Sequence, residues 1–180
     1  MTPKPEFSRT YRIDTLGGQP RAISIGADEA ERAALARRFN LPAIAHLSAE
    51  AAIARSGESV TAEGRVRAEV TQSCVATGEP VEEVVDEPFR IEFRPHPETA
   101  AEEEIELSEG ELDVVFYDGN AVDLGDAVAE TVSLALNPFP RSKKAEEALR
   151  QAGVKTEEEA KIESSPFAAL QGLKDKLGGG

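Results

Sequence analysis

The stretch AVDLGDAVAETVSLALNPFPR, residues 121–141, is the longest segment of the chain with a regular helical period. Asp123 is expected to cap the helix, because its carboxylate can accept the unpaired amide hydrogens of the first turn. Pro138 and Pro140 end it, since proline lacks an amide hydrogen and disfavours a helical residue before it. We therefore expect a buried helix over about 123–136. Its apolar face comprises Val122, Leu124, Ala127, Val128, Thr131, Val132, Leu134, Ala135 and Leu136.

Upstream of that helix, residues 59–73 form the clearest strand pattern, because small apolar and polar residues alternate over the whole segment. A turn is expected near residues 76–80. Residues 81–94 then return with apolar positions again alternating, and Pro88 indicates a sheet edge or a bulge. The two segments together predict a long β-hairpin over about 59–94.

Residues 43–56 carry two conflicting patterns. Their many alanines favour a helix, whereas their period-two alternation favours a strand, and we interpret the segment as a strand. The whole pattern predicts an α+β fold, in which an antiparallel sheet is covered by the helix at about 123–136, with peripheral helices. The further expected elements are strands at 7–13, 21–25 and 114–117 and helices at 28–40, 142–152 and 165–174.

These elements suggest two parts of unequal size. Residues 1–141 are expected to form a single α+β domain, with a polar, acid-rich loop at 95–113. Residues 142–180 are expected to form a charged helical C-terminal extension that ends in a flexible glycine tail.

The net charge of −14 is concentrated in one region. Residues 82–118 hold 14 acidic and two basic residues, so the remainder is nearly neutral. Such an acidic protein will not wrap nucleic acid over a broad surface, because that binding depends on neutralising phosphates. The acidic region is either a solvated loop or a contact for a basic protein partner.

Several classes of protein are disfavoured by the sequence. The chain shows neither an apolar run of the ~20 residues that a membrane helix needs nor a signal-peptide pattern, so a cytoplasmic protein is expected. Cys74 is the single cysteine, which excludes an internal disulfide, and with two histidines it argues against a metal site. Phosphate-binding loops, dinucleotide fingerprints and nucleophile elbows are also lacking. We therefore expect a non-enzymatic protein with no catalytic residue, cofactor, metal or small-molecule substrate.

Arg65 and Arg67 are the best candidates for binding, because two arginines on one strand face can both reach a phosphate or a carboxylate. Arg55 joins them if residues 47–55 pair with this strand beside them. The alternative is that the two arginines pair across strands with Glu82 or Glu83. The remaining candidates for RNA or partner binding are Pro138, Phe139, Arg141 and Phe167.

Three blocks of sequence occur in an order that is similar to a known family. The first combines GRVRA at 64–68, Cys74, EPV at 79–81 and DEPF at 86–89. The second runs from VDLGDAVAE at 122–130 to LALNPFP at 134–140, and the third is SPFAAL at 165–170. Together they resemble the YceD family, the large ribosomal RNA subunit accumulation proteins, over roughly residues 7–175. Many relatives carry further cysteines, and the single-cysteine form resembles the alphaproteobacterial branch.

The resemblance implies a bacterial, non-enzymatic factor in large ribosomal subunit biogenesis that supports the accumulation or processing of 23S rRNA. Its implied partners are 23S rRNA or its precursor and a basic large-subunit ribosomal protein. The alternative hypothesis is an acidic adaptor that binds basic partners without contacting RNA.

Overall fold

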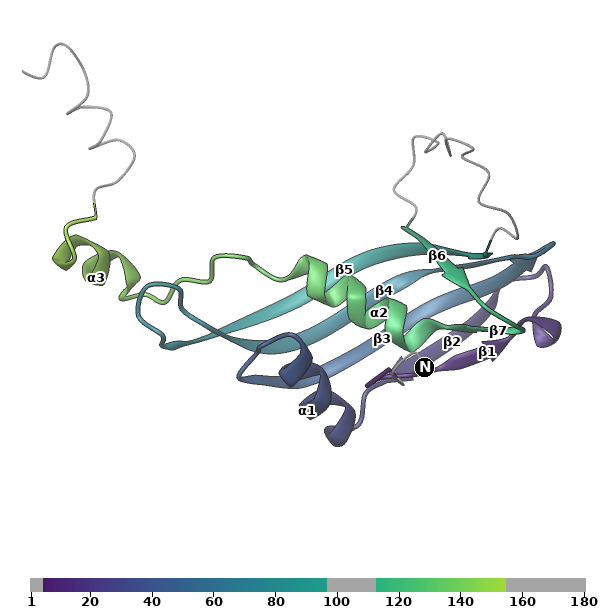
Figure 1. Ribbon diagram of the computed structural model, residues 1–180, viewed down its shortest axis with the longest axis horizontal. Coiled ribbons are helices and arrows are strands. Elements are labelled where there is room, and N and C mark those ends of the chain that lie inside the picture. The colour runs from purple at the N-terminus through teal and green to yellow at the C-terminus, as the bar shows by residue number, and fades with distance from the viewer. Residues whose placement is uncertain (1–4, 97–112, 155–180) are drawn as a thin grey trace, which may run out of the picture.

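The computed structural model describes residues 5–96 and 113–154 (Figure 1). A five-stranded sheet has the order β2-β3-β4-β5-β6, and β1 pairs separately with β7. Along the chain the elements are β1 (Thr10–Arg12), the 3-10 turn η1 (Ile13–Thr15), β2 (Arg21–Gly26), α1 (Glu29–Arg38), β3 (Ala43–Ser56), β4 (Ser59–Ser73), β5 (Pro80–Pro95), β6 (Asp113–Tyr117), β7 (Ala121–Asp123), α2 (Leu124–Ala135) and α3 (Ala145–Gln151). The predicted α+β class is confirmed.

The long hairpin is confirmed as β4 and β5, which pair antiparallel from Val60 opposite Phe93 to Ser73 opposite Pro80. The ambiguous segment is also a strand, since β3 pairs antiparallel with β4. One departure from a purely antiparallel sheet is β6, which runs parallel to β5 and pairs only with its last five residues. Pro88 therefore lies in the part of β5 that β6 does not cover, so the expected edge position is confirmed.

Strands β3 and β4 approach each other closely near Ala51. Gly64 of β4 lies opposite Ala51 of β3, and a Cβ atom built on Gly64 would lie 2.1 Å from the Glu50 carbonyl oxygen. The two backbones approach each other so closely that only glycine fits at this position. Ala51 thus has a small side chain because of packing within the sheet, and an alanine of this kind is not a helix signal.

Both larger helices cover the same face of the sheet (Figure 1). Helix α2 packs on β4 and β5, and α1 packs on β3. Arg38 of α1 joins the helices through ion pairs with Asp126 at 2.9 Å and Glu130 at 3.7 Å. The core lies between this layer and the sheet, and its largest fully buried side chains are Phe7, Leu35, Leu47, Ile53, Val60, Val66, Ile91, Phe93, Val122, Leu124, Val128 and Val132.

The predicted packing helix is confirmed, with two differences. Val122 contributes to the core from β7 rather than from the helix. Leu134 was expected on the buried face but is 82% exposed, whereas its neighbours Ala135 and Leu136 still pack against the core. At about 100° per residue, Leu134 lies roughly 120° around the helix from the buried Val128 and so points away from the sheet.

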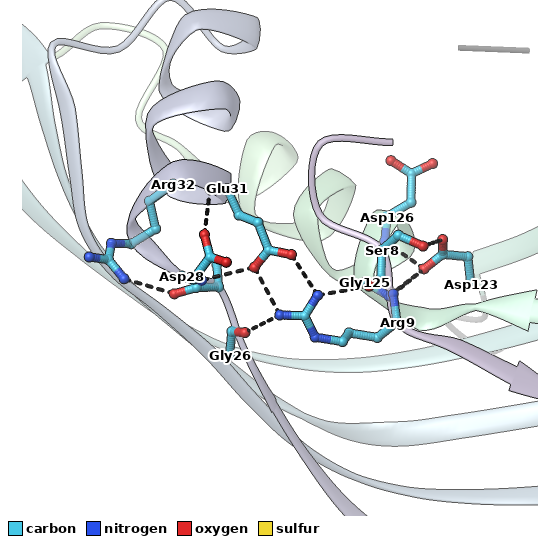
Figure 2. A network of polar contacts seen from close by, with 10 residues as sticks. Ser8, Arg9, Gly26, Asp28, Glu31, Arg32, Asp123, Gly125 and Asp126 are labelled. Carbon is cyan, nitrogen blue, oxygen red and sulfur yellow. Dashed lines mark hydrogen bonds and ion pairs between the residues drawn. The ribbon is translucent and has the colours of Figure 1, made fainter. Parts of the chain in front are cut away.

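The start of α2 is fixed by a network of polar contacts that also involves α1 (Figure 2). Asp123 caps α2 by accepting from the Gly125 amide at 3.0 Å, and it also accepts from the Arg9 amide at 2.8 Å. The Arg9 guanidinium donates two hydrogen bonds to Glu31, at 2.6 and 2.8 Å. Glu31 in turn completes a capping box with Asp28 at the start of α1. The N-terminal segment thus connects the beginnings of both helices.

This network also explains why the first strand is shorter than expected. Strand character was predicted for residues 7–13, yet β1 spans only Thr10–Arg12. Phe7 is buried in the core, while Ser8 and Arg9 are held at the α2 terminus. Tertiary contacts therefore replace strand pairing in the first half of the segment.

The strands at Arg21–Gly26 and Asp113–Tyr117 and the helix α1 are confirmed to within a few residues. So is α3, which ends before Gly153 at a φ of +76°. The acidic loop at 95–113 and the helix at 165–174 lie wholly or largely outside the described residues. The division into a domain over 1–141 and an extension over 142–180 stays a prediction. None of the helices in the described part of the chain has the length and hydrophobicity needed to cross a bilayer.

Candidate functional site

Arg65 and Arg67 project from the face of the sheet opposite the helices, which we call the open face. Their side chains are 59% and 60% exposed, as strand alternation predicted. Arg65 donates from Nη1 to the Asp86 carboxylate at 2.7 Å and to the Asp86 carbonyl oxygen at 3.1 Å. Arg67 lies 3.9 Å from the Glu69 carboxylate.

The expected pairing of these arginines with Glu82 or Glu83 is therefore wrong. In the observed register Arg67 lies opposite Asp86, and Arg65 reaches the same aspartate diagonally. Glu83 lies opposite the buried Val70 and belongs to the covered face, so it is out of reach. The register between β4 and β5 decides which acidic residue lies near each arginine, and the sequence alone does not give this register to within a few residues.

The open face carries more acidic than basic side chains. Each of its four arginines lies within 4 Å of an acidic oxygen. Its charged residues in β3, β4 and β5 are the acids Glu50, Glu63, Glu69, Glu82, Asp86 and Glu92 and the arginines Arg65, Arg67, Arg90 and Arg94. An approaching phosphate would meet arginines that each have a carboxylate nearby, on a face with an excess of acidic side chains.

Arg55 does not join the pair of arginines. It lies opposite Val60, at the end of the sheet, which is roughly 17 Å along β4 from Arg65 at a rise of about 3.4 Å per residue. Its guanidinium donates to the carbonyl oxygens of Gly57 at 2.7 Å and Ile13 at 3.2 Å. It lines a separate pocket of about 300 Å³.

The other candidate residues lie in the segment 137–143 that leaves α2, which we call the exit loop. The buried Gln72 of β4 donates to the Asn137 carbonyl oxygen at 3.2 Å and also to the Glu83 carboxylate. Glu83 accepts from the Asn137 amide at 3.2 Å. The Asn137 side chain accepts from the Phe139 amide at 2.9 Å, which fixes the turn.

The far end of the exit loop is anchored as well. Pro140 is buried, and its carbonyl oxygen accepts from the Val75 amide at 2.9 Å. Pro138 and Arg141 are exposed on either side of this anchor, and Phe139 is 69% exposed. The loop therefore holds its backbone against the hairpin while it presents an aromatic side chain to solvent.

The exit loop also differs from the rest of the chain in charge. Residues 137–143 contain two basic side chains, Arg141 and Lys143, and no acidic one, in a chain with a net charge of −14. Lys144 pairs with Glu79 at 2.9 Å. Arg141 and Lys143 are exposed and have no ion-pair or hydrogen-bond partner within residues 5–96 and 113–154.

Cys74 ties the exit loop to the tip of the β4–β5 hairpin. It is buried, and its Sγ accepts from the Ser142 amide at 3.3 Å. The pKa of this thiol is lowered to about 6, chiefly by that hydrogen bond and next by one from the Thr77 hydroxyl. Its contacts give Cys74 a role in holding the loop.

Sequence reasoning missed the residues that support the exit loop. Gln72 is the one buried polar residue among those the structure describes. The sequence does mark Gln72 as unusual, because strand alternation in β4 puts it on the buried face, where an apolar residue is expected. Phe167, the last candidate, lies outside the described residues.

Comparison with known proteins identifies the family. A family model described as "Large ribosomal RNA subunit accumulation protein YceD" matches residues 62–174, which is more than half of the chain. The match begins within β4 and continues through α3, and thus includes Arg65, Arg67 and the exit loop but not β3. No curated protein matches this chain, and no solved structure matches it. On the strength of the family match, the chain belongs to the YceD family.

Proposed function

We propose that this protein supports the accumulation of 23S rRNA by binding components of the assembling large ribosomal subunit, without catalysing a reaction. The family match supports the link to large-subunit RNA. The observation that carries the binding mode is the open face, which no helix covers within the described residues and which exposes charged side chains along β4 and β5. An extended face of this kind suits recognition of a macromolecule.

The charge of the open face favours a basic large-subunit ribosomal protein as its occupant. The acidic side chains of this face outnumber its arginines by six to four. A shallow hollow over β2, β3 and β4 is lined by Glu50 and Glu63 together with small residues, among them Ala22, Ser24 and Ala52. Small residues beside two carboxylates leave room for lysine or arginine side chains from a partner.

The proposal is tested by sedimentation of lysates on sucrose gradients, together with the ratio of 23S to 16S rRNA in cells that lack the protein. We expect the protein to migrate with precursors of the large subunit and its loss to lower 23S rRNA selectively. Migration at the top of the gradient with a normal ratio of the two RNAs would contradict the proposal.

A charge-reversed variant of the open face tests the partner. Glu50→Lys/Glu63→Lys should reduce co-migration with large-subunit precursors, because it opposes a basic partner at the hollow. The matched control is Glu58→Lys/Asp118→Lys, which makes the same change in net charge at exposed positions between strands, outside the open face and away from the exit loop. Equal loss in both variants would show that only total charge matters.

A second candidate function is an acidic adaptor that binds basic partners without any contact with RNA. The pairing of all four open-face arginines with carboxylates favours it, because no unpaired cation remains on that face in the described residues. Capture of basic ribosomal proteins by the purified chain, with no measurable affinity for RNA, would favour this candidate.

A further inference from the structure

We propose that the exit loop, residues 137–143, is a preformed contact for unpaired RNA, in which Phe139 stacks on a base while Arg141 and Lys143 bind the neighbouring phosphates. This inference rests on the proposed role in large-subunit RNA accumulation, but it concerns a different surface from the open face.

Phe139 exposes most of its aromatic side chain to solvent, with 69% of its surface accessible. Few aromatic residues are buried in the core, so another large side chain could have been useful there. Burying Phe139 inside the fold would be favourable, yet the hydrogen bonds to Asn137 and Pro140 hold the backbone so that it points outward. An exposed aromatic ring on a fixed backbone is ready to stack, because little conformational entropy is lost on binding.

Side chains of β4 and β5 hold the backbone of the exit loop against the sheet. Gln72 uses its buried amide group to hold the Asn137 carbonyl oxygen, and Glu83 accepts from the Asn137 amide. Burying such polar groups stabilises the fold only when they are hydrogen-bonded, so their position is specific to this loop geometry. Cys74 adds a third anchor through the Ser142 amide.

The segment that follows Phe139 is basic. Arg141 and Lys143 follow Phe139 by two and four residues and have no partner among the described residues. The carboxylates of Glu79 and Glu83, which contact this part of the chain, are already engaged. An aromatic side chain next to unpaired cations is the usual arrangement for single-stranded nucleic acid, in which the ring binds a base and the cations bind phosphates. A purely apolar protein pocket would leave both cations unused.

The experiment measures binding of the full chain to a fluorescently labelled, unstructured RNA of about 12 nucleotides, by fluorescence anisotropy over a range of salt. Phe139→Ala should weaken binding about tenfold, whereas Phe139→Trp should preserve it, because base stacking depends on the ring. Arg141→Ala/Lys143→Ala should lower the slope of log affinity against log salt by about 1.4, which corresponds to two single-strand phosphates. A duplex of the same sequence should bind more weakly than the single strand.

Two variants serve as matched controls. Leu134→Ala removes another exposed apolar side chain from the same region, and Arg65→Ala/Arg67→Ala removes two cations from the open face. Both should bind the RNA as the unmodified chain does. Since Phe139 is exposed, its variants should keep the melting temperature of the unmodified protein.

The inference is overturned if the unmodified chain does not bind the RNA, if Phe139→Ala binds as well as the unmodified chain, or if duplex and single strand bind equally. It is also overturned if Phe139→Ala abolishes co-migration with large-subunit precursors at unchanged RNA affinity, since Phe139 would then contact a protein. The proposed function fails by a separate result, namely a normal 23S to 16S ratio in cells that lack the protein.

Discussion

The open face and the exit loop use arginine in opposite ways. On the open face, Arg65 and Arg67 lie among acidic side chains, and Asp86 takes two hydrogen bonds from Arg65. In the exit loop, Arg141 is exposed two residues after the exposed Phe139 and has no partner in the described part of the chain. The number of cations in a segment therefore says little about binding until their partners are known.

This difference has a structural cause. A strand in a sheet has neighbours on both sides, so the register places a side chain across from almost every arginine. A loop that is held through its backbone leaves its side chains free, because Asn137 and Pro140 bond through main-chain groups. The predictions below separate the two regions, beginning with the largest expected effect.

The largest effect is expected from Gly64→Ala, which breaks the sheet beneath the open face. A Cβ atom at this position would lie 2.1 Å from the Glu50 carbonyl oxygen and 2.6 Å from the Ala51 Cα, so the β3 and β4 backbones must separate. We expect the free energy of unfolding to fall by about 3 kcal/mol, at the upper end for overpacking. Urea unfolding followed by circular dichroism measures the change.

Gly26→Ala is the matched control for that variant. It also replaces a strand glycine, but its new Cβ atom would lie 3.7 Å from the nearest atom, the Leu47 carbonyl oxygen, at an ordinary contact distance. Its stability should stay close to that of the unmodified chain. Similar unfolding midpoints for both variants would show that the close approach at Gly64 is not a constraint.

The second effect is expected from Gln72→Ala, which removes the support of the exit loop. The variant leaves the Asn137 carbonyl oxygen and the Glu83 carboxylate without their buried donor, and this should cost about 1–3 kcal/mol of unfolding free energy. RNA affinity should also fall, although Phe139 and the cations remain. Gln151→Ala, at an exposed glutamine of α3, is the control and should change neither property.

The framework of the sheet could be predicted from sequence, because the alternation in residues 59–73 and 81–94 depends only on which face is buried. The cap at Asp123 is equally local. The close approach at Gly64 and the register that gives Arg65 to Asp86 depend on contacts between distant residues. Local pattern carries no information about such contacts.

The candidate site was predicted unevenly for the same reason. Phe139 and Arg141 were chosen because two prolines end the helix beside them, and both are exposed. Arg55 was placed too near Arg65, since the sequence does not show that β3 and β4 meet in a tight turn that sets Arg55 opposite Val60. The role of Gln72 needed the path of the exit loop, which only the tertiary structure provides.

The third effect is a pH dependence from Cys74, the thiol that joins the exit loop to the tip of the β4–β5 hairpin. The pKa of Cys74 in the folded protein is lowered to about 6 by the Ser142 amide, whereas an unfolded thiol titrates near 8.5. Between these values the unfolded chain binds the extra proton, so stability should rise with pH from about 6 to 8.5 and be lost as pH falls through 6. Cys74→Ser should lack this rise in urea unfolding series. The ultraviolet absorbance of the thiolate, if it titrates near 8.5 in the folded protein, would contradict the assignment.

The smallest effect is expected from the pair Arg65 and Asp86, and it is the most direct test of the comparison. Both side chains are more than half exposed, so a double-mutant cycle in urea unfolding should give a coupling of only about 0.5 kcal/mol. RNA binding is the more informative measurement. If Asp86 keeps Arg65 from binding phosphate, Asp86→Ala should raise the affinity for single-stranded RNA, because it frees Arg65 and also removes a repelling charge. The gain should be largest at low salt, where electrostatic interactions are least screened. Glu58→Ala removes the same charge from the exposed turn between β3 and β4, away from the exit loop, and so controls for the change in net charge. An equal gain in both variants would mean that pairing does not matter, and that the two regions differ only in their net charge.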